Sequence, residues 1–300
     1  MSDAAIKEGQ FAALSNGTRL HYATAGESGQ PLMLFLHGFP EFWYEWCAQL
    51  AEFGGEYFAV APDLRGFNLS DMPVEVSAYK ARHIIDDIRL LAAHLGYDKL
   101  ILVAHDWGGA IAWSFAVALP QLLHKLIIIN APHPYLFARA LAEDPRQQDA
   151  SQYMNWLRAP GSETALARND FAVLEGFFKG STDWLSGETR ERYHASWSRG
   201  LLGGVNYYRA SPLHPADQGQ PATGLLKLNP EDYRVRVPVR VIWGEDDAAL
   251  PKLLLDGLDE LVDDLQVERI PEATHWVIHE QPARINALIR RFVESGRRES

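Results

Sequence analysis

Short apolar segments recur along the chain, and each of them is apolar on both faces. Such a strand is covered on both sides of a sheet, whereas a half-exposed strand alternates apolar and polar residues. The predicted strands are 32–36, 57–61, 100–104, 126–129, 239–243 and, with a weaker pattern, 267–270. Helical patterns lie between them at about 43–53, 79–95 and 107–119. This alternation predicts an α/β fold with a mostly parallel central sheet that is flanked by helices.

The alternation stops at Pro132 and resumes near Arg236. The stretch between them holds aromatic and charged residues, several prolines and helical patterns, but no clear strand. We therefore divide the chain into an α/β core of residues 1–131 and 237–300 and a mostly helical insertion, 132–236, whose size suits a subdomain. Ligands of parallel sheets bind beyond the carboxyl ends of the strands. An insertion that follows a strand would cover that site as a lid.

The segment 104–109, with the sequence AHDWGG, follows a predicted strand and opens a predicted helix. Small residues two before and two after a central residue allow a very sharp strand-to-helix turn, which lifts the central side chain above the sheet. The central residue here is Asp106, at a position where serine is the usual occupant. An aspartate that caps the helix is the alternative interpretation. The sequence of strand, turn and helix favours a nucleophile.

A second loop, His37-Gly38-Phe39-Pro40, also follows a predicted strand. In folds with such a nucleophile turn, this loop supplies one backbone N–H of an oxyanion hole, and the residue after the nucleophile supplies the other. We predict Phe39 and Trp107 as the two donors. A simple Gly-Pro turn is the alternative interpretation when the loop is considered alone.

The segment Gly244-Glu245-Asp246-Asp247 comes directly after the predicted strand 239–243. A carboxylate at this point fits the expected chain order of nucleophile, acid and base. We predict Asp247 as the acid, with Asp246 as the alternative if the register is shifted.

The base is predicted to be His275, in the segment Thr274-His275-Trp276. The chain has other histidines near the motifs, at positions 37, 105 and 279. His275 comes shortly after the last predicted strand and precedes the final helix, which Pro282 helps to begin.

Composition narrows the range of partners and compartments. The net charge of −11 and the lack of a basic patch argue against nucleic acid and anionic membrane surfaces as partners. The single cysteine, Cys47, allows no internal disulfide. No apolar leader or membrane-spanning segment is visible, so we expect a cytoplasmic protein. Neither a ligand-spaced Cys/His cluster nor a Gly-rich nucleotide loop appears, so we expect no metal and no organic cofactor. The oligomeric state is left open, a homo-oligomer included.

With these motifs in place, the chain resembles the α/β-hydrolase-fold epoxide hydrolases of the soluble epoxide hydrolase type, which are related to the haloalkane and fluoroacetate dehalogenases. The resemblance extends from Asn16-Gly17, a hairpin turn signal, to Phe292. Its motifs are HGFPE at 37–41, DLRGF at 63–67, HDWGG at 105–109, GEDD at 244–247 and THW at 274–276. The first three are shared with dehalogenases, so they indicate the branch and not the substrate. The resemblance implies an α/β-hydrolase fold with an inserted helical lid.

The lid distinguishes the two activities. Epoxide hydrolases of this type resemble one another in carrying two lid tyrosines that hydrogen-bond the epoxide oxygen. Tyr153 and Tyr208 stand at the matching positions, with Tyr207 as a register alternative to Tyr208. Packing is the ordinary role of any single tyrosine. The pair therefore favours an epoxide substrate.

Dehalogenases require groups that bind a halide or a substrate carboxylate. Haloalkane dehalogenases typically pair the tryptophan after the nucleophile with an asparagine after His-Gly or with another tryptophan; here Trp107 is present but Phe39 replaces that asparagine. Fluoroacetate dehalogenases carry arginines just after the aspartate, where this chain has Trp107 and Ala110, and a His-Trp pair where it has Tyr153-Met154. These departures argue against a haloacid substrate.

The resemblance implies a two-step hydrolysis of an apolar epoxide to a vicinal diol. Asp106 would attack an epoxide carbon to form an ester, and water activated by His275 would hydrolyse that ester. The predicted substrate contacts are His37, Pro40, Trp107, Tyr153 and Tyr208. A dehalogenase that uses the same Asp106, His275 and Asp247 is the nearest rival. A non-catalytic homologue that binds a small molecule is the rival of another class, and its expected mark, a broken triad, is not visible.

Overall fold

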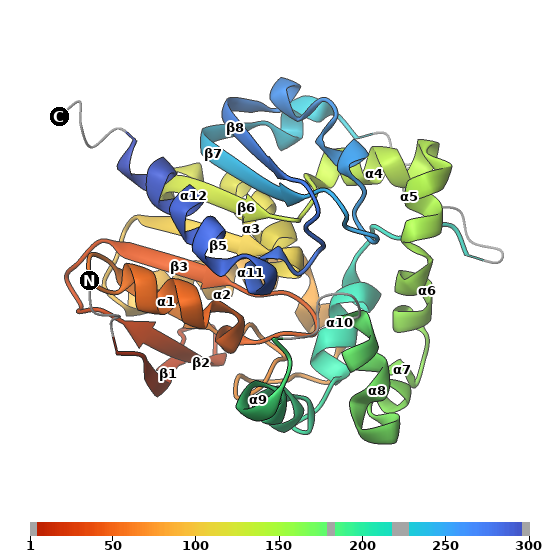
Figure 1. The fold of residues 1–300 in the computed structure, drawn as a ribbon, viewed down its shortest axis with the longest axis horizontal. Coiled ribbons are helices and arrows are strands. Elements are labelled where there is room, and N and C mark those ends of the chain that lie inside the picture. Colours follow the sequence, from red (N-terminus) through yellow and green to blue (C-terminus); the bar gives the residue numbers. More distant parts are fainter. Residues whose placement is uncertain (1–4, 179–183, 218–227, 296–300) are drawn as a thin grey trace.

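The computed structural model describes residues 5–178, 184–217 and 228–295. Its centre is an eight-stranded sheet in which the strand order is β1-β2-β4-β3-β5-β6-β7-β8 (Figure 1). β1 and β2 pair antiparallel, β2 pairs antiparallel with β4, and the remaining pairs are parallel. In this spatial order the strands are β1 (Lys7–Ala13), β2 (Arg19–Ala25), β4 (Phe58–Pro62), β3 (Leu32–Leu36), β5 (Leu100–His105), β6 (Leu123–Ile129), β7 (Val235–Gly244) and β8 (Val262–Ile270). The predicted mostly parallel sheet is confirmed.

The burial of each strand explains how closely its observed bounds agree with the bounds predicted from the sequence. Every residue of β3, β4 and β5 is buried, and their observed bounds agree with the predicted ones to within one residue. β8 is an edge strand whose central residues are mostly exposed, so only its last part carried an apolar pattern. β7 begins at Val235, two residues before the predicted restart of the core, and its pairing with β8 shifts register between Val235 and Pro238. Such a shift of register interrupts the periodicity on which the prediction depended.

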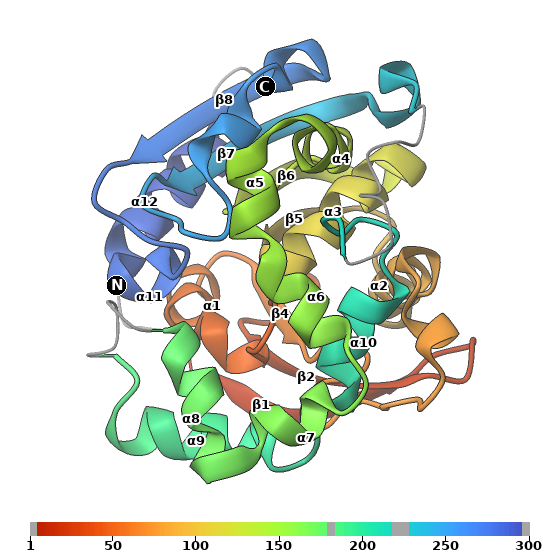
Figure 2. The same ribbon diagram turned by 90° about the vertical axis from the view of Figure 1, so that its right-hand side faces the viewer.

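Helices cover both faces of the sheet (Figure 2). α1 (Cys47–Phe53) and α12 (Pro282–Glu294) pack together on one face, and α2 (Ala81–His94) and α3 (Asp106–Ala118) pack together on the other. The amphipathic pattern of α12 explains why this helix packs on the sheet. Its buried residues are Ile285, Leu288, Ile289, Phe292 and Val293. Apolar residues at intervals of three and four form one stripe along a helix, and that stripe faces the sheet.

The chain between β6 and β7 is mostly helical in its described residues. Its helices are α4 (Pro134–Glu143), α5 (Pro145–Ala150), α6 (Gln152–Arg158), α7 (Ser162–Leu166), α8 (Arg168–Phe177), α9 (Gly187–Trp197) and α10 (Leu202–Ala210). Residues 179–183 and 218–227 of the predicted insertion lie outside the described part. In Figure 1 α5, α6 and α10 lie beyond the carboxyl ends of the parallel strands. None of the helices among the described residues is long and apolar enough to cross a membrane.

Candidate active site

The turn between β5 and α3 places Asp106 in a strained backbone conformation. Its φ is +47°, in the left-handed region that non-glycine residues seldom adopt. The turn leaves no space around it: a Cβ added to Gly38 would lie 2.2 Å from Asp106 Oδ1, and one added to Gly108 would lie 2.4 Å from the Leu36 carbonyl oxygen. Asp106 is itself the first residue of α3, and the N-cap position, His105, makes no side-chain capping bond. The alternative of a capping aspartate is therefore not what the structure shows.

The Asp106 carboxylate is held from two sides. The Phe39 N–H donates to Oδ1 at 2.7 Å, and Nε2 of His275 lies 3.6 Å from Oδ2. Burial by itself would raise the pKa of Asp106, but hydrogen bonding to His275 and the Phe39 N–H and the charges of His275 and His105 lower it below its usual value. The carboxylate is therefore ionised at neutral pH.

Asp247 orients the ring of His275. Its Oδ2 lies 2.6 Å from His275 Nδ1 and also accepts the Asn130 side-chain N–H at 2.8 Å. Its Oδ1 accepts the backbone N–H groups of Ala249 and Leu250. With both oxygens occupied, this carboxylate can turn only by breaking several bonds. Asp246, the register alternative, is exposed to solvent.

The same contacts set the protonation of His275. Burial by itself would lower its pKa, but the charge of Asp247 and hydrogen bonds to Asp106 and Asp247 outweigh burial and raise the pKa to about 9. With Asp106 ionised, His275 is therefore a cation at neutral pH.

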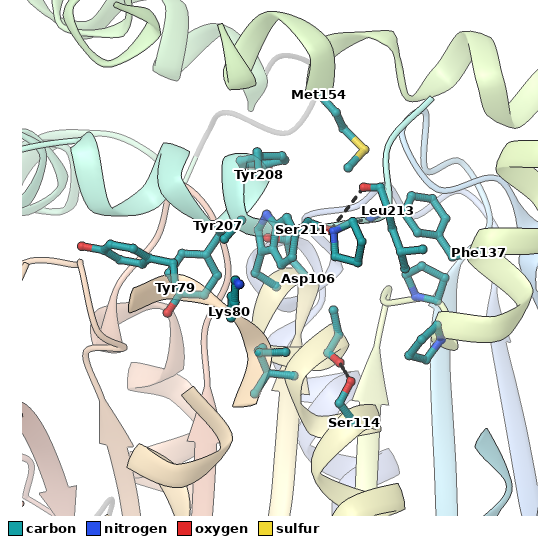
Figure 3. Close-up of a pocket in the computed structure, with 18 of the residues that line it drawn as sticks. Tyr79, Lys80, Asp106, Ser114, Phe137, Met154, Tyr207, Tyr208, Ser211 and Leu213 are labelled. Atoms are coloured by element: carbon teal, nitrogen blue, oxygen red, sulfur yellow. Dashed lines mark hydrogen bonds between the residues drawn. The ribbon is translucent and has the colours of Figure 1, made fainter. Parts of the chain in front are cut away.

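Asp106 forms part of the wall of a cavity of about 550 Å³ (Figure 3). In the figure Tyr208, from α10, lies above Asp106, and Met154, from α6, lies at the top of the view. The wall is largely apolar, and its members include Trp107, Ile111, Phe137, Tyr153, Met154, Tyr208, Leu213 and Leu250. A cavity of this size suits a small organic molecule.

Two tyrosines from the helices between β6 and β7 lie together in this wall. The ring centroids of Tyr153 and Tyr208 are 6.2 Å apart, and Tyr208 meets Trp107 edge to face at 5.0 Å. Burial and the nearby charge of Asp106 raise the pKa of the Tyr153 phenol far above its usual value. Burial, Tyr153 and the charge of Asp106 likewise raise the pKa of the Tyr208 phenol well above its usual value. Both side chains are therefore neutral hydrogen-bond donors at any ordinary pH.

Tyr207 has a different environment from its neighbour, although it also borders the cavity. It is buried, and its hydroxyl donates to the Arg65 carbonyl oxygen at 3.0 Å. Its only phenolic proton is thus directed at the protein backbone.

Comparison with known proteins identifies the family. The family model for the α/β hydrolase fold matches residues 31–282. Human "Epoxide hydrolase 4" is 36% identical over 94% of this chain and 78% of its own length. The Bacillus subtilis "AB hydrolase superfamily protein YfhM" is 35% identical over 94% of this chain and 96% of its own. The crystal structure of Bacillus megaterium epoxide hydrolase with an inhibitor superposes with a TM-score of 0.87 at 36% identity, over 95% of this chain and all of that one. The chain belongs to the α/β-hydrolase-fold epoxide hydrolases.

Membership of the epoxide hydrolase family makes this protein a hydrolase, and it confirms the predicted fold class. The structure brings together Asp106, His275, Asp247, Tyr153, Tyr208, Trp107 and the Phe39 N–H.

Two of the predicted substrate contacts do not line the cavity in the described residues. His37 is fully buried, with Nδ1 2.8 Å from the Gly38 carbonyl oxygen and Nε2 accepting the Leu64 N–H at 3.0 Å. Pro40 borders a separate small cavity, and its carbonyl oxygen accepts the Trp197 indole N–H. Both residues hold the loop that carries the Phe39 N–H.

Asn130 is a site residue of this epoxide hydrolase that sequence analysis missed. It follows β6 with a φ of +39°, and its amide contacts the Asp247 carboxylate and both the N–H and the carbonyl oxygen of Gly244. An asparagine directly after a buried parallel strand was the available signal.

Proposed function

We propose that the protein hydrolyses epoxides to vicinal diols through a covalent ester on Asp106. One observation carries the proposal: a largely buried, ionised carboxylate faces an apolar cavity, with a histidine on one side and two neutral phenols in the same wall. A phenol pair can protonate the oxygen that leaves when an epoxide ring opens. Relatives from animals, plants and bacteria that are named epoxide hydrolases support the same substrate class.

In the first step an oxygen of Asp106 attacks one epoxide carbon, and the bond from that carbon to the ring oxygen breaks. The Phe39 N–H occupies Oδ1, so we assign the attack to Oδ2. Tyr153 and Tyr208 hydrogen-bond the ring oxygen, and one of them transfers its proton to it. The products are a hydroxyalkyl ester of Asp106 and a tyrosinate.

In the second step His275 acts as the base. Once Asp106 is an ester its negative charge is gone, so the pKa of His275 falls and the Nε2 proton of its cation passes through solvent to the tyrosinate. The neutral Nε2 then takes a proton from water. The hydroxide attacks the Asp106 carboxyl carbon, and the N–H groups of Phe39 and Trp107 stabilise the oxyanion, each contributing about 3–4 kcal/mol. The bond from that carbon to Oδ2 breaks, and the diol leaves with Oδ2. The hydroxyl group that entered gives its proton to the leaving alkoxide, and His275 keeps the proton that it took from water, which restores its resting cation. Epoxide and water have then become diol.

We also propose that the helical segment within residues 132–236 is a lid. Its α6 and α10 supply Tyr153 and Tyr208, while the core supplies Asp106 and His275. A site closed in this way excludes bulk water from the ester, so hydrolysis depends on the water bound beside His275.

A substrate panel tests the proposal. Styrene oxide and an aliphatic epoxide should give diols, whereas haloalkanes and a haloacid should release no halide. Asp106→Ala should lose turnover of every epoxide with an unchanged circular dichroism spectrum. In a single turnover in ¹⁸O-labelled water, the label should enter Asp106 and not the diol. Halide release by the wild type, ligand binding without turnover, or diol formation by Asp106→Ala would each contradict the proposal.

A further inference from the structure

Two adjacent glycines lie at the start of α10, the helix that carries Tyr208. The helix begins at Leu202, and Gly203 and Gly204 follow in its first turn. A glycine inside a helix costs about 0.5–1 kcal/mol relative to alanine, so two in succession require a structural reason. Neither glycine has a positive φ, so the reason is the space around them.

Gly203 lies directly against the backbone of the core. A Cβ added to Gly203 would lie 2.1 Å from the Gly66 carbonyl oxygen and 2.3 Å from the Gly66 Cα. Gly66 belongs to the loop after β4 and has a φ of +89°, which glycine adopts without strain. Because backbone meets backbone here, no side chain can turn aside to make room for a methyl group.

The loop that receives Gly203 is itself firmly held. Arg65, which precedes Gly66, is buried and forms a two-pronged ion pair with Asp87 of α2, with both N···O distances 2.7 Å. Its guanidinium also donates to the Thr18 hydroxyl at 2.7 Å. A bidentate pair of this kind fixes orientation as well as distance. α10 therefore docks on a rigid part of the core.

The same loop holds the segment that carries the Phe39 N–H. The Leu64 N–H donates to His37 Nε2 at 3.0 Å, and the rings of His37 and Phe67 meet edge to face with their centroids 4.8 Å apart. One loop thus determines the position of a donor to the Asp106 carboxylate and the position of α10.

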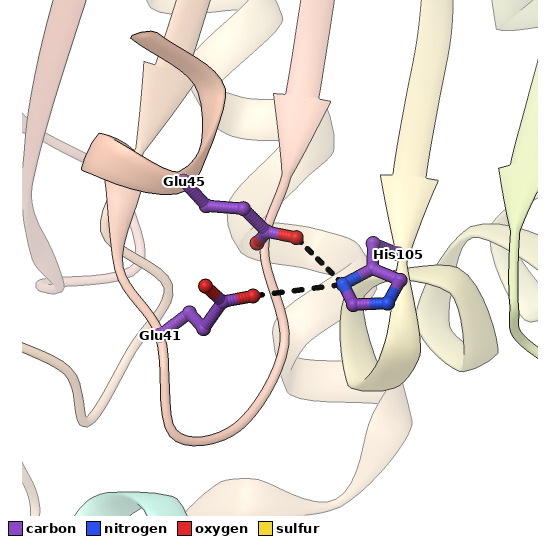
Figure 4. Close-up of side chains that lie close together, drawn as sticks. All are labelled: Glu41, Glu45 and His105. Atoms are coloured by element: carbon purple, nitrogen blue, oxygen red, sulfur yellow. Dashed lines mark ion pairs between the residues drawn. The ribbon is translucent and has the colours of Figure 1, made fainter. Parts of the chain in front are cut away.

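The neighbouring helix of the proposed lid is attached to the core through side chains instead. The Tyr193 hydroxyl of α9 donates to Glu41 Oε1 at 2.6 Å, and Glu41 lies in the core beside Glu45 and His105 (Figure 4). Side chains adjust to small displacements by rotation about their χ angles, whereas the backbone contact at Gly203 cannot. The distance between α10 and the core therefore depends on Gly203.

Tyr208 moves with Gly203 because both belong to one helix of nine residues, whose internal hydrogen bonds keep its rise per residue fixed. The Tyr208 ring lies 5.0 Å from that of Trp107 and 6.2 Å from that of Tyr153, between centroids. A shift of α10 away from the loop would carry the Tyr208 phenol away from Asp106.

We propose that Gly203 is a positioning residue for ester formation. Because it has no side chain, α10 docks backbone to backbone on Gly66, and this docking sets the distance at which the Tyr208 phenol meets the epoxide oxygen. The inference rests on the proposed function. It concerns the first chemical step alone, because Asp247 and His275, which act in the second, are held by contacts within the core.

Gly203→Ala tests the docking. Its methyl group would overlap the Gly66 carbonyl oxygen, so α10 must move away from the loop. A displacement of about 1 Å can cost about 10²-fold in rate, and we expect ester formation on Asp106 to slow by about this factor. Hydrolysis of the ester once formed should stay within about twofold of the wild type. Rapid mixing with styrene oxide and mass spectrometry of the Asp106 peptide give both rate constants.

A double-mutant cycle separates positioning from a general loss of structure. Tyr208→Phe removes the phenol itself, so adding Gly203→Ala to that variant should slow ester formation little further. If Gly203 only supports the fold, the two losses multiply instead.

Two control variants share parts of the change. Gly55→Ala adds a methyl group where nothing lies within 4 Å, so both rate constants should match the wild type. Tyr207→Phe removes the hydrogen bond between α10 and the Arg65 carbonyl oxygen but keeps the close contact at Gly203, so it too should form the ester at the wild-type rate.

If Gly203→Ala does not fold, Gly204→Ala replaces it. A Cβ at Gly204 would lie 2.7 Å from the Phe39 ring, which can turn, so α10 should move less and ester formation should slow about threefold to tenfold.

Three results would overturn the proposal: wild-type ester formation in the glycine variant, an equal loss in both chemical steps, or losses that multiply in the cycle. If the wild type forms no ester on Asp106, the proposed function fails instead. A crystal structure of Gly203→Ala then still tests the docking, and an unmoved α10 would refute it.

Discussion

Two histidine–aspartate pairs in this molecule share one geometry. In each, Nδ1 of the histidine lies 2.6 Å from Oδ2 of the aspartate: His275 with Asp247, and His21 with Asp63. Both aspartates are fully buried at the side chain. His275 is 13% exposed and its Nε2 faces Asp106, whereas His21 is 2% exposed and its ring lies edge to face against Phe11.

The difference lies in what else each aspartate holds. Asp63 accepts the Trp43 N–H at 3.0 Å and the Asn68 amide at 2.8 Å, so this pair fastens the loops after β3 and β4. Asp247 is fastened in the same way, but its histidine has one nitrogen left to face a carboxylate at a cavity. A histidine–aspartate pair is thus a rigid structural element. It can take part in catalysis only where the second ring nitrogen of the histidine reaches a reacting group.

The largest expected difference between the pairs is in turnover. His275→Gln should still form the Asp106 ester but should hydrolyse it at least about 10³-fold more slowly, because no base remains to activate water. His21→Gln is the matched control and should turn over normally per folded molecule. Mass spectrometry of the Asp106 peptide after incubation with an epoxide should show the adduct in His275→Gln alone. An adduct-free His275→Gln protein would argue against the two-step scheme.

A second contrast is between the neighbours Tyr207 and Tyr208. The double variant Tyr153→Phe/Tyr208→Phe should slow ester formation about 10²–10³-fold, because no phenol remains to protonate the opening ring. Tyr207→Phe loses only its bond to the Arg65 carbonyl oxygen and should form the ester at the wild-type rate. Pre-steady-state kinetics of ester formation measure both. Equal losses in the two proteins would show that the phenols serve packing.

The contrast between the two pairs also explains how far sequence reasoning reaches. Most strands were predictable because burial on both faces gives a run of apolar residues, and Asp106 and Asp247 were predictable because each follows such a strand. His275 was predictable from its place between the last, weaker strand and the final helix. His37 and Pro40 were placed in the substrate site because they adjoin Phe39, but a backbone N–H can face a cavity while its neighbours face away. The contacts of Asn130 with Asp247 and Gly244 join segments far apart in the chain, and no local pattern encodes such a contact.

The next largest effect is expected in the pH dependence of the free energy of unfolding, through the ionisation of His275. The pKa of His275 is raised to about 9, from about 6.5 in an unfolded chain. A raised pKa means that the folded state binds the proton more tightly than the unfolded chain does. The protonation of His275 therefore contributes about 3 kcal/mol to the free energy of unfolding. This contribution is complete below pH ~6.5 and is lost as the pH rises through ~9. Urea unfolding of the wild type and of His275→Gln over this range should show the decline in the wild type and its absence in the variant. Parallel curves would contradict the assignment of this ionisation to His275.

The smallest effect concerns the structural pair itself. His21→Gln leaves the Asp63 carboxylate buried, with the Trp43 N–H and the Asn68 amide as donors but without its partner ring. Leaving a buried polar group without one of its partners typically costs about 1–3 kcal/mol of folding free energy, and the donors that remain favour the lower end of that range. Urea unfolding at neutral pH measures the loss, and Asp63→Asn should give a loss of similar size. If His21→Gln instead lowers turnover without lowering stability, then the loops after β3 and β4 transmit strain to the Phe39 N–H, and the division between a structural and a chemical pair must be abandoned.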